Sequence, residues 1–357
     1  MTTQQEALEL ARGVEQLVGE RFDRRALHAF VDSGNLRDDG LMAMASEIGC
    51  FALAVPEAQG GLGLDPASLV PTYQVLGAYM APLPVISCAL AGNLLARAEA
   101  GQWLARLGEG ATFAVCLPPW SELRMEGGDG GARLYGALPL VLDGADADVL
   151  LVRAQSEPGA VWLAIDTKAA GVVCTPVPLV DETRNAAGVD FAGVAIPPSS
   201  VIAEGDMARL LDAALAAHAA LALAADSLGG AKAMLGKTVD YLKVREQFGR
   251  PIGSFQALKH RAANLHLKAT VAQALLDEAV DAAHAGDGSA AMLAHLAFAQ
   301  AANAYAAIAE DCLQLHGGIG FTLDHDAHLH LKRAKLNQAL LDGADAARDA
   351  AARLVTR

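Results

Sequence analysis

The helical periodicity of the last part of the chain constrains the fold more than any other feature. Beyond Gly205 the sequence is rich in alanine and leucine, and apolar residues recur every three or four positions. That spacing is typical of helices that pack against other helices. It predicts long helices over Asp206–Val244, Ser254–Ala285, Ser289–Leu315 and Ala327–Leu340. Residues 205–357 should therefore form a four-helix bundle.

The two preceding regions have different textures. Residues 1–110 carry helical patterns such as ALELARGVEQLV, broken by Pro- and Gly-rich segments, which predict an N-terminal helical domain. Residues 111–204 contain short apolar runs such as DVLLVRA and VWLAID between Gly, Pro and Asp turns, which predict a small antiparallel β domain, a barrel. The fold class is therefore α+β in three parts.

Composition and charge exclude several classes of protein. Hydrophobic residues make up 53% of the chain, so subunit contacts should cover the excess apolar surface. Charged residues interrupt each apolar run before it reaches the length of about 18–20 residues that a membrane span needs. The N-terminus lacks the pattern of a secretion signal, which favours the cytoplasm. A net charge of −14 argues against nucleic acid as a partner.

Cysteines and histidines give no pattern of a metal or disulfide site. The five cysteines are scattered, with no Cys-x-x-Cys pair, which is typical of reduced, buried thiols. His325, His328 and His330 lie close in sequence to Asp324 and Asp326, and these are ligand types. Because no three-ligand pattern such as His-Glu-x-x-His occurs, we expect no metal.

Two breaks between the long helices carry chemistry. The first, REQFGRPIGSFQ, contains a Gly-Pro-Gly loop, with Ser254 a plausible N-cap for the next helix. The second, QLHGGIGFTLDHD, ends a helix on Gly317 and Gly318, which can adopt positive φ and admit a bound group close to the backbone. The sequence has no Gly-x-Gly-x-x-Gly or Walker A motif, which argues against Rossmann and P-loop nucleotide binding.

Four segments, in order, resemble the acyl-CoA dehydrogenase family over nearly the whole chain. They are LAVPEAQGGLG (Leu53–Gly63), YLKVREQFGRPIGSFQALKH (Tyr241–His260), QLHGGIGFTLDHD (Gln314–Asp326) and HLHLKRAKL (His328–Leu336). The resemblance is strongest to short bacterial members that act as subunits in the breakdown of steroids and other bulky acids. It implies FAD as cofactor, an acyl-CoA substrate, an electron-transfer flavoprotein as electron acceptor, and a dimer or tetramer of like or unlike chains.

The resemblance also implies which residues hold FAD. Arg245, Gln247 and Phe248 offer a cation, an amide and a flat apolar ring, which suit pyrophosphate, isoalloxazine and adenine. Arg245, Phe248 and Gln256 would reach the ADP part, and Gln314, Gly317 and Gly318 of a neighbouring chain would meet it. Taken singly, Arg245 could instead cap a helix, Phe248 could be a core aromatic, and the two glycines could form a simple helix-ending turn.

The catalytic base is harder to place. The resemblance puts this carboxylate at Ala219, which cannot ionise, or at Leu341, where a one-residue slip would make it Asp342. Asp342 could equally be the N-cap of a helix beginning near Ala344. Asp226 shares the face of Ala219 but lies about 10 Å further along the helix axis. It could instead be a buried group paired with Lys232 or a neighbouring helix.

The β domain also departs from the family. Its flavin-facing stretch corresponds to ATFAVCLPPWSELRM, where Trp120, Ser121 and Thr112 could supply part of the flavin face, or Trp120 could be a core aromatic. The resemblance therefore leaves two functions open. One is an FAD-dependent acyl-CoA dehydrogenase. The other is a non-catalytic or cofactor-presenting subunit, whose base comes from a partner chain.

Overall fold

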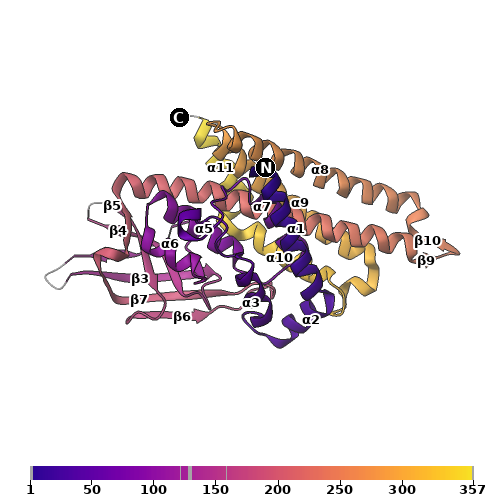
Figure 1. The fold of residues 1–357 in the computed structure, drawn as a ribbon. Coiled ribbons are helices and arrows are strands. Elements are labelled where there is room, and N and C mark those ends of the chain that lie inside the picture. The colour runs from indigo at the N-terminus through magenta and orange to yellow at the C-terminus, as the bar shows by residue number, and fades with distance from the viewer. Residues whose placement is uncertain (1–2, 121, 128–130, 158, 356–357) are drawn as a thin grey trace.

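The computed structural model of the chain describes residues 3–120, 122–127, 131–157 and 159–355. Figure 1 shows a sheet domain at one end of the molecule, long helices running away from it, and N-terminal helices packed across the junction. The predicted succession of N-terminal helices, middle sheet and C-terminal helices is confirmed. A crevice lies where these three parts meet.

The N-terminal part consists of short helices that begin at identifiable caps. The Asp23 carboxylate accepts hydrogen bonds from Arg25 N (2.9 Å) and Ala26 N (3.0 Å), and Asp38 accepts one from Leu41 N (2.8 Å). These bonds satisfy amides that a helix start leaves unpaired. The helices are α1 (Thr3–Arg21), α2 (Arg24–Ser33), α3 (Asp39–Glu47), α4 (Val70–Tyr79), α5 (Val85–Arg97) and α6 (Gly101–Gly108), with a 3-10 turn η1 (Glu57–Gln59).

The middle part is one twisted sheet of eight strands. Its pairing order is β6-β7-β3-β2-β4-β5-β8, with β1 paired to β4. Most pairs are antiparallel as predicted, but β1 and β2 each run parallel to β4. The strands are β1 (Phe113–Val115), β2 (Arg124–Glu126), β3 (Ala132–Leu142), β4 (Val149–Ser156), β5 (Gly159–Asp166), β6 (Val172–Pro176), β7 (Ala186–Ile196) and β8 (Val201–Glu204), with η2 (Pro198–Ser200) before β8.

The C-terminal part contains the long helices that the periodicity predicts, within one or two residues at most ends. They are α7 (Gly205–Val244), α8 (Gln256–His284), α9 (Ala290–His316), α10 (Ala327–Ala339) and α11 (Gly343–Val355). Short elements join them: strands β9 (Glu246–Gln247) and β10 (Arg250–Pro251), and 3-10 turns η3 (Ile252–Ser254), η4 (Gly317–Phe321) and η5 (Leu340–Asp342). The predicted Ser254 cap is wrong, because Phe255 occupies that position and the buried Ser254 Oγ has no partner among the described residues.

Helix α7 is long and apolar enough to cross a membrane, judged by length and composition alone. In the structure 56% of its most apolar window is buried within the protein. Figure 1 shows it passing beneath the N-terminal helices and alongside α9. These contacts explain its apolar character as that of a core helix.

Helices α4 and α7 touch backbone to backbone. A Cβ built on Gly77 would lie 2.0 Å from the carbonyl oxygen of Asp226, and one on Gly229 would lie 1.9 Å from that of Gln74. Only glycine fits at both positions, because real Cβ contacts do not fall below 3.0 Å. This close approach fixes α4 beside the segment of α7 that lines the crevice.

Candidate functional site

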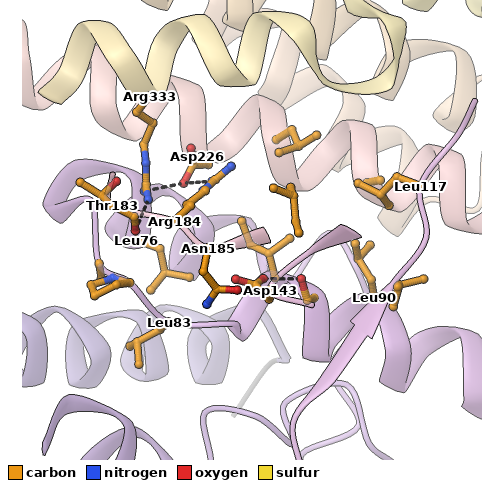
Figure 2. A pocket seen from close by; sticks show the side chains of 18 of the residues that line it. Leu76, Leu83, Leu90, Leu117, Asp143, Thr183, Arg184, Asn185, Asp226 and Arg333 are labelled. Carbon is orange, nitrogen blue, oxygen red and sulfur yellow. Dashed lines mark hydrogen bonds and ion pairs between the residues drawn. The ribbon is translucent and has the colours of Figure 1, made fainter. Parts of the chain in front are cut away.

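A crevice opens where the three parts of the chain meet (Figure 2). Its apolar wall comes from the α2–α3 loop, α4, the α4–α5 connection, α5, the sheet domain and α7: Leu36, Leu76, Ala81, Pro82, Leu83, Ile86, Leu90, Val115, Leu117, Leu142, Ala219 and Leu223. Its polar groups are Ser87, Asp143, Thr183, Arg184, Asn185, Asp226 and Arg333. The cavity volume is about 30 Å³. The site is therefore narrow and mostly apolar.

A buried ion network forms one end of the crevice. Asp226 Oδ1 pairs with Arg184 Nη2 (2.9 Å) and Arg333 Nη1 (3.4 Å), and Asn337 donates to Oδ2 (2.7 Å). Arg333 also pairs with Asp181 (3.1 Å). Burial alone would raise the pKa of Asp226, but the two guanidiniums and the amide outweigh it and hold that pKa below its usual range. Asp226 is thus a permanent anion that joins α7 to the sheet domain and α10.

The network corrects one predicted pairing. Lys232 does not contact Asp226, because its ammonium reaches Gln273 on α8 instead. The neighbouring-helix alternative is the right one, with α10 supplying Arg333 and Asn337. Arg184, from the loop between β6 and β7, was not among the predicted partners, and it comes from a different domain.

A second carboxyl, Asp143, lies apart from this network in the same crevice (Figure 2). It follows β3 in a tight turn with φ +58°, where its N–H donates to the Asn185 carbonyl (2.9 Å). Ser87 Oγ on α5 donates to Asp143 Oδ2 at 2.5 Å. Burial raises the pKa of Asp143 to about 6, although the Ser87 hydrogen bond and the nearby Arg184 oppose that shift. Sequence reasoning missed this residue, since its turn has no motif.

The two base positions that the resemblance implies differ sharply in placement. Ala219 is fully buried and lines the crevice. Asp342 is exposed, has φ +60° beside Leu341 with φ +55°, and does not line the crevice. Helix α11 begins at Gly343, directly after it. The structure therefore shows no carboxyl at the α7 position and keeps Asp342 outside the pocket walls.

The residues expected to hold FAD lie at the far end of the bundle. Arg245 caps the end of α7, and Gln247 and Phe248 lie in the β9–β10 hairpin that follows it, which Figure 1 places at the end of α7 away from the sheet. Gln256 begins α8. All four are exposed, and the Phe248 side chain is 92% exposed at φ +54°. The alternative of an ordinary packed core ring is therefore excluded for Phe248 in the single chain.

The twin-glycine turn lies at the same end. Gln314 is exposed on the last turn of α9, and Gly317 adopts φ +64°, whereas Gly318 does not have positive φ. A Cβ at either glycine would meet nothing within 4 Å, so the backbone is open to an approaching group. Tyr241 Oη, shortly before the hairpin, donates to the His316 carbonyl (3.3 Å). Both expected FAD-binding turns therefore lie close together, and both lie outside the crevice.

These residues fit part of a dinucleotide site. The exposed Arg245 guanidinium suits a pyrophosphate, the uncovered Phe248 ring offers a flat partner for adenine, and the open backbone at Gly317 leaves room for close approach. Every one of these groups faces outward rather than into a closed cavity. A single chain thus presents one open side of such a site.

Histidines and tryptophan at the other predicted positions have structural contacts. Among the described residues, no group of three or more His, Cys, Asp or Glu side chains could hold a metal ion. The His330 ring shares a hydrogen bond with Tyr305 (2.9 Å), and Asp326 accepts from His28 (2.8 Å). Trp120 packs edge-on against Trp162, which favours the core alternative. Ser121 lies outside the described residues, and Thr112 is bonded to Asp148 (3.1 Å).

Comparisons with known proteins agree with this architecture. A family model described as acyl-CoA dehydrogenase, C-terminal domain, matches residues 210–350. The acyl-CoA dehydrogenase IpdE2 of Mycobacterium tuberculosis is 34% identical over 346 residues, covering 96% of this chain and 95% of that protein. FadE34 of the same organism is 34% identical over 80% of this chain and 38% of its own length.

Solved structures extend the similarity to the whole fold. The ChsE4–ChsE5 complex from Mycobacterium tuberculosis contains a chain with TM-score 0.87 and 25% identity, covering 100% of this chain and 98% of that one. A chain of the Tcur3481–Tcur3483 steroid ACAD G363A variant has TM-score 0.86 and 27% identity, with 99% of both chains covered. Butyryl-CoA dehydrogenase of Megasphaera elsdenii shares the fold, with TM-score 0.87 at 20% identity.

Proposed function

Because the chain belongs to the acyl-CoA dehydrogenase family, we propose that it takes part in the FAD-dependent 2,3-desaturation of an acyl-CoA thioester. The family places it among oxidoreductases that act on CH–CH bonds. The observation that carries the finer proposal is the crevice at the three-domain junction, with an apolar wall suited to an acyl group and a carboxyl of raised pKa in it. We further propose that the chain acts in the cytoplasm.

The substrate in this proposal is a bulky acyl-CoA. Its support is the description of one structural relative as a steroid ACAD, together with the apolar character of the crevice wall. Bound FAD would supply the hydride acceptor, and an electron-transfer flavoprotein would remove the electrons. Arg245, Gln247, Phe248 and Gln256 would hold the nucleotide, and Gln314, Gly317 and Gly318 would meet it across a subunit boundary. Their exposure in the single chain supports such a shared site.

A second function is favoured by two observations. The α7 position of the expected base is Ala219, and the crevice is narrow in this chain. Two structural relatives are named as assemblies of two different proteins. On this alternative the chain presents the cofactor within a heteromer, and the partner supplies the base. Asp342 as the chain's own base remains a prediction from resemblance, and its exposure does not favour it.

One purification experiment separates the two functions. The chain would be purified alone and together with a related chain that carries glutamate at the position matching Ala219. Bound flavin would be measured by absorbance, then acyl-CoAs added with an artificial electron acceptor. We expect flavin in the oligomer and bleaching by a bulky acyl-CoA. Bleaching only in the presence of the partner would establish the cofactor-presenting function, and absence of flavin from both samples would refute the FAD proposal.

Phe248→Ala tests the nucleotide site without disturbing the fold. We expect FAD affinity to fall about 10- to 100-fold, because stacking of a base on an aromatic ring contributes about 1–3 kcal/mol. The melting temperature of the cofactor-free protein should not change, since the ring is 92% exposed. Leu210→Ala, another exposed apolar residue at the opposite end of α7, is the matched control. Equal FAD affinity in wild type and Phe248→Ala would show that the Phe248 ring does not contribute to FAD binding.

A further inference from the structure

Two carboxyls line the crevice among the described residues, and only one of them can readily accept a proton. Both oxygens of Asp226 are engaged, Oδ1 by Arg184 and Arg333 and Oδ2 by the Asn337 amide. Protonating Asp226 would remove the carboxylate charge that pairs with Arg184 and one of the two that pair with Arg333, which is why the pKa of Asp226 is lowered. Asp226 is therefore a structural anion.

Asp143 has the opposite surroundings. Its Oδ2 accepts the Ser87 hydroxyl, and its Oδ1 has no hydrogen-bond partner in the part of the chain that the structure describes. It shares the crevice wall with Leu90, Leu117 and Leu142. The left-handed backbone and the bond from its N–H to Asn185 hold the side chain in place. One oxygen is thus oriented by Ser87, and the other is available to a ligand.

We propose that Asp143 is the proton acceptor of this crevice. It takes the role of the catalytic base, which Ala219 cannot fill because alanine has no ionisable group. The inference rests on the function proposed above. Asp143 Oδ1 would take the proton from C2 of the thioester as the C2–H bond breaks. The electron pair of the C2–H bond would form the C2=C3 double bond, and the hydride on C3 would pass to the oxidised flavin that bound FAD supplies. Asp143 ends protonated, and the substrate has lost one proton and one hydride.

The electrostatic surroundings of Asp143 suit the role of a catalytic base. A base works best when its pKa lies near the working pH, and burial raises the pKa of Asp143 to about 6. The charged groups that face it are Arg184 and Arg333, which lower that pKa, and Asp146, which raises it. The buried Cys88 thiol on α5 lies within the electrostatic range of Asp143, and burial keeps it neutral by raising its pKa to about 12. Ser87, which acts through Asp143, is a positioning residue.

The test measures proton removal separately from flavin reduction. The flavin-loaded protein would be mixed in D₂O with a 3-thiaacyl-CoA, whose sulfur at position 3 leaves no hydride to transfer. Exchange of the C2 hydrogens is followed by mass spectrometry. We expect Asp143→Asn to slow exchange about 10²–10⁴-fold, with the affinity for the thioester and the melting temperature retained. Asparagine tolerates positive φ and can still accept the Ser87 hydrogen bond.

Asp190→Asn is the matched control, because Asp190 is an exposed carboxyl on β7 that does not line the crevice. Its exchange rate should match wild type. Ser87→Ala should move the acidic limb of the exchange rate to higher pH, since the lost hydrogen bond had stabilised the carboxylate. A purely structural Ser87 would leave that limb in place.

Several outcomes overturn the inference. The inference fails if Asp143→Asn exchanges the C2 hydrogens at the wild-type rate. It also fails if Asp342→Asn, with Asp143 intact, no longer exchanges them. Exchange that appears only when a glutamate-bearing partner is present assigns the base to that partner. Exchange without flavin reduction by a normal acyl-CoA would leave Asp143 as the acceptor but refute the proposed dehydrogenation. No exchange by wild type, with or without the partner, refutes the inference directly.

Discussion

Replacement of Arg333 by alanine is expected to lower the free energy of unfolding by about 3–5 kcal/mol, because it leaves the buried Asp181 without this counter-ion and Asp226 with one guanidinium fewer. The Arg333 side chain is 1% exposed and pairs with Asp181 (3.1 Å) and Asp226 (3.4 Å). Both carboxylates are themselves buried. Urea denaturation followed by circular dichroism measures the change.

The control for Arg333→Ala is Arg348→Ala. Arg348 forms an exposed pair with Asp345 one turn earlier on α11, and such pairs contribute about 0–1 kcal/mol. If Arg333→Ala does not fold, Arg333→Lys still reports on the network. It keeps the charge but loses the planar fork that spans two carboxylates, so we expect an intermediate loss. A loss below about 1 kcal/mol for Arg333→Ala would show that the network contributes no more than an exposed pair does.

The network matters for function because it joins three segments at the crevice. Asp226 belongs to α7, Arg333 to α10, and Arg184 to the loop before β7. Asp181 and Thr183, in the same loop, are also bonded to Arg333. Loss of the Arg333 guanidinium would therefore break the links from α10 to Asp181 and Thr183, and would leave the Arg184–Asp226 pair to hold the sheet domain against α7 beside the crevice.

The helices were predictable because their signals are local. Apolar residues at helical spacing place α7 at Gly205–Val244, where the periodicity predicts Asp206–Val244. The same is true of α9, predicted over Ser289–Leu315 and found over Ala290–His316. The Ser254 cap failed for a local reason as well. A 3-10 turn precedes α8, so the chain enters the helix one residue later than the usual cap pattern expects.

The candidate site was only partly predictable because its contacts are distant in sequence. The spacing from the Tyr241–Phe248 motif predicts position 219 as a base position, and Ala219 does line the crevice. Asp143 could not be found that way, because its partner Ser87 is 56 residues away. Asp226 was recognised as a buried polar group, but its partner Arg184 lies in another domain. Sequence identifies the charged residue, whereas only the packed structure selects its counter-ion.

Gly229→Ala gives the second large expected effect. The added Cβ would lie 1.9 Å from the Gln74 carbonyl oxygen, so α4 and α7 must move apart for the methyl to fit. Overpacking of this kind costs about 1–3 kcal/mol, and backbone cannot yield as a flexible side chain can. Separation would also move Leu76 away from Asp226, both of which line the crevice, so thioester affinity should fall with stability.

The same helix supplies the control that isolates this contact. Gly236 is exposed on α7, and a Cβ there would meet nothing within 4 Å. Gly236→Ala should therefore stabilise the protein by about 0.5–1 kcal/mol through helix propensity alone. Because both substitutions gain the same propensity, the difference between their melting temperatures measures the steric cost at Gly229. Equal stabilisation by both substitutions would mean that α4 does not pack tightly against α7 at Gly229. This close contact would then not be what holds α4 beside the crevice.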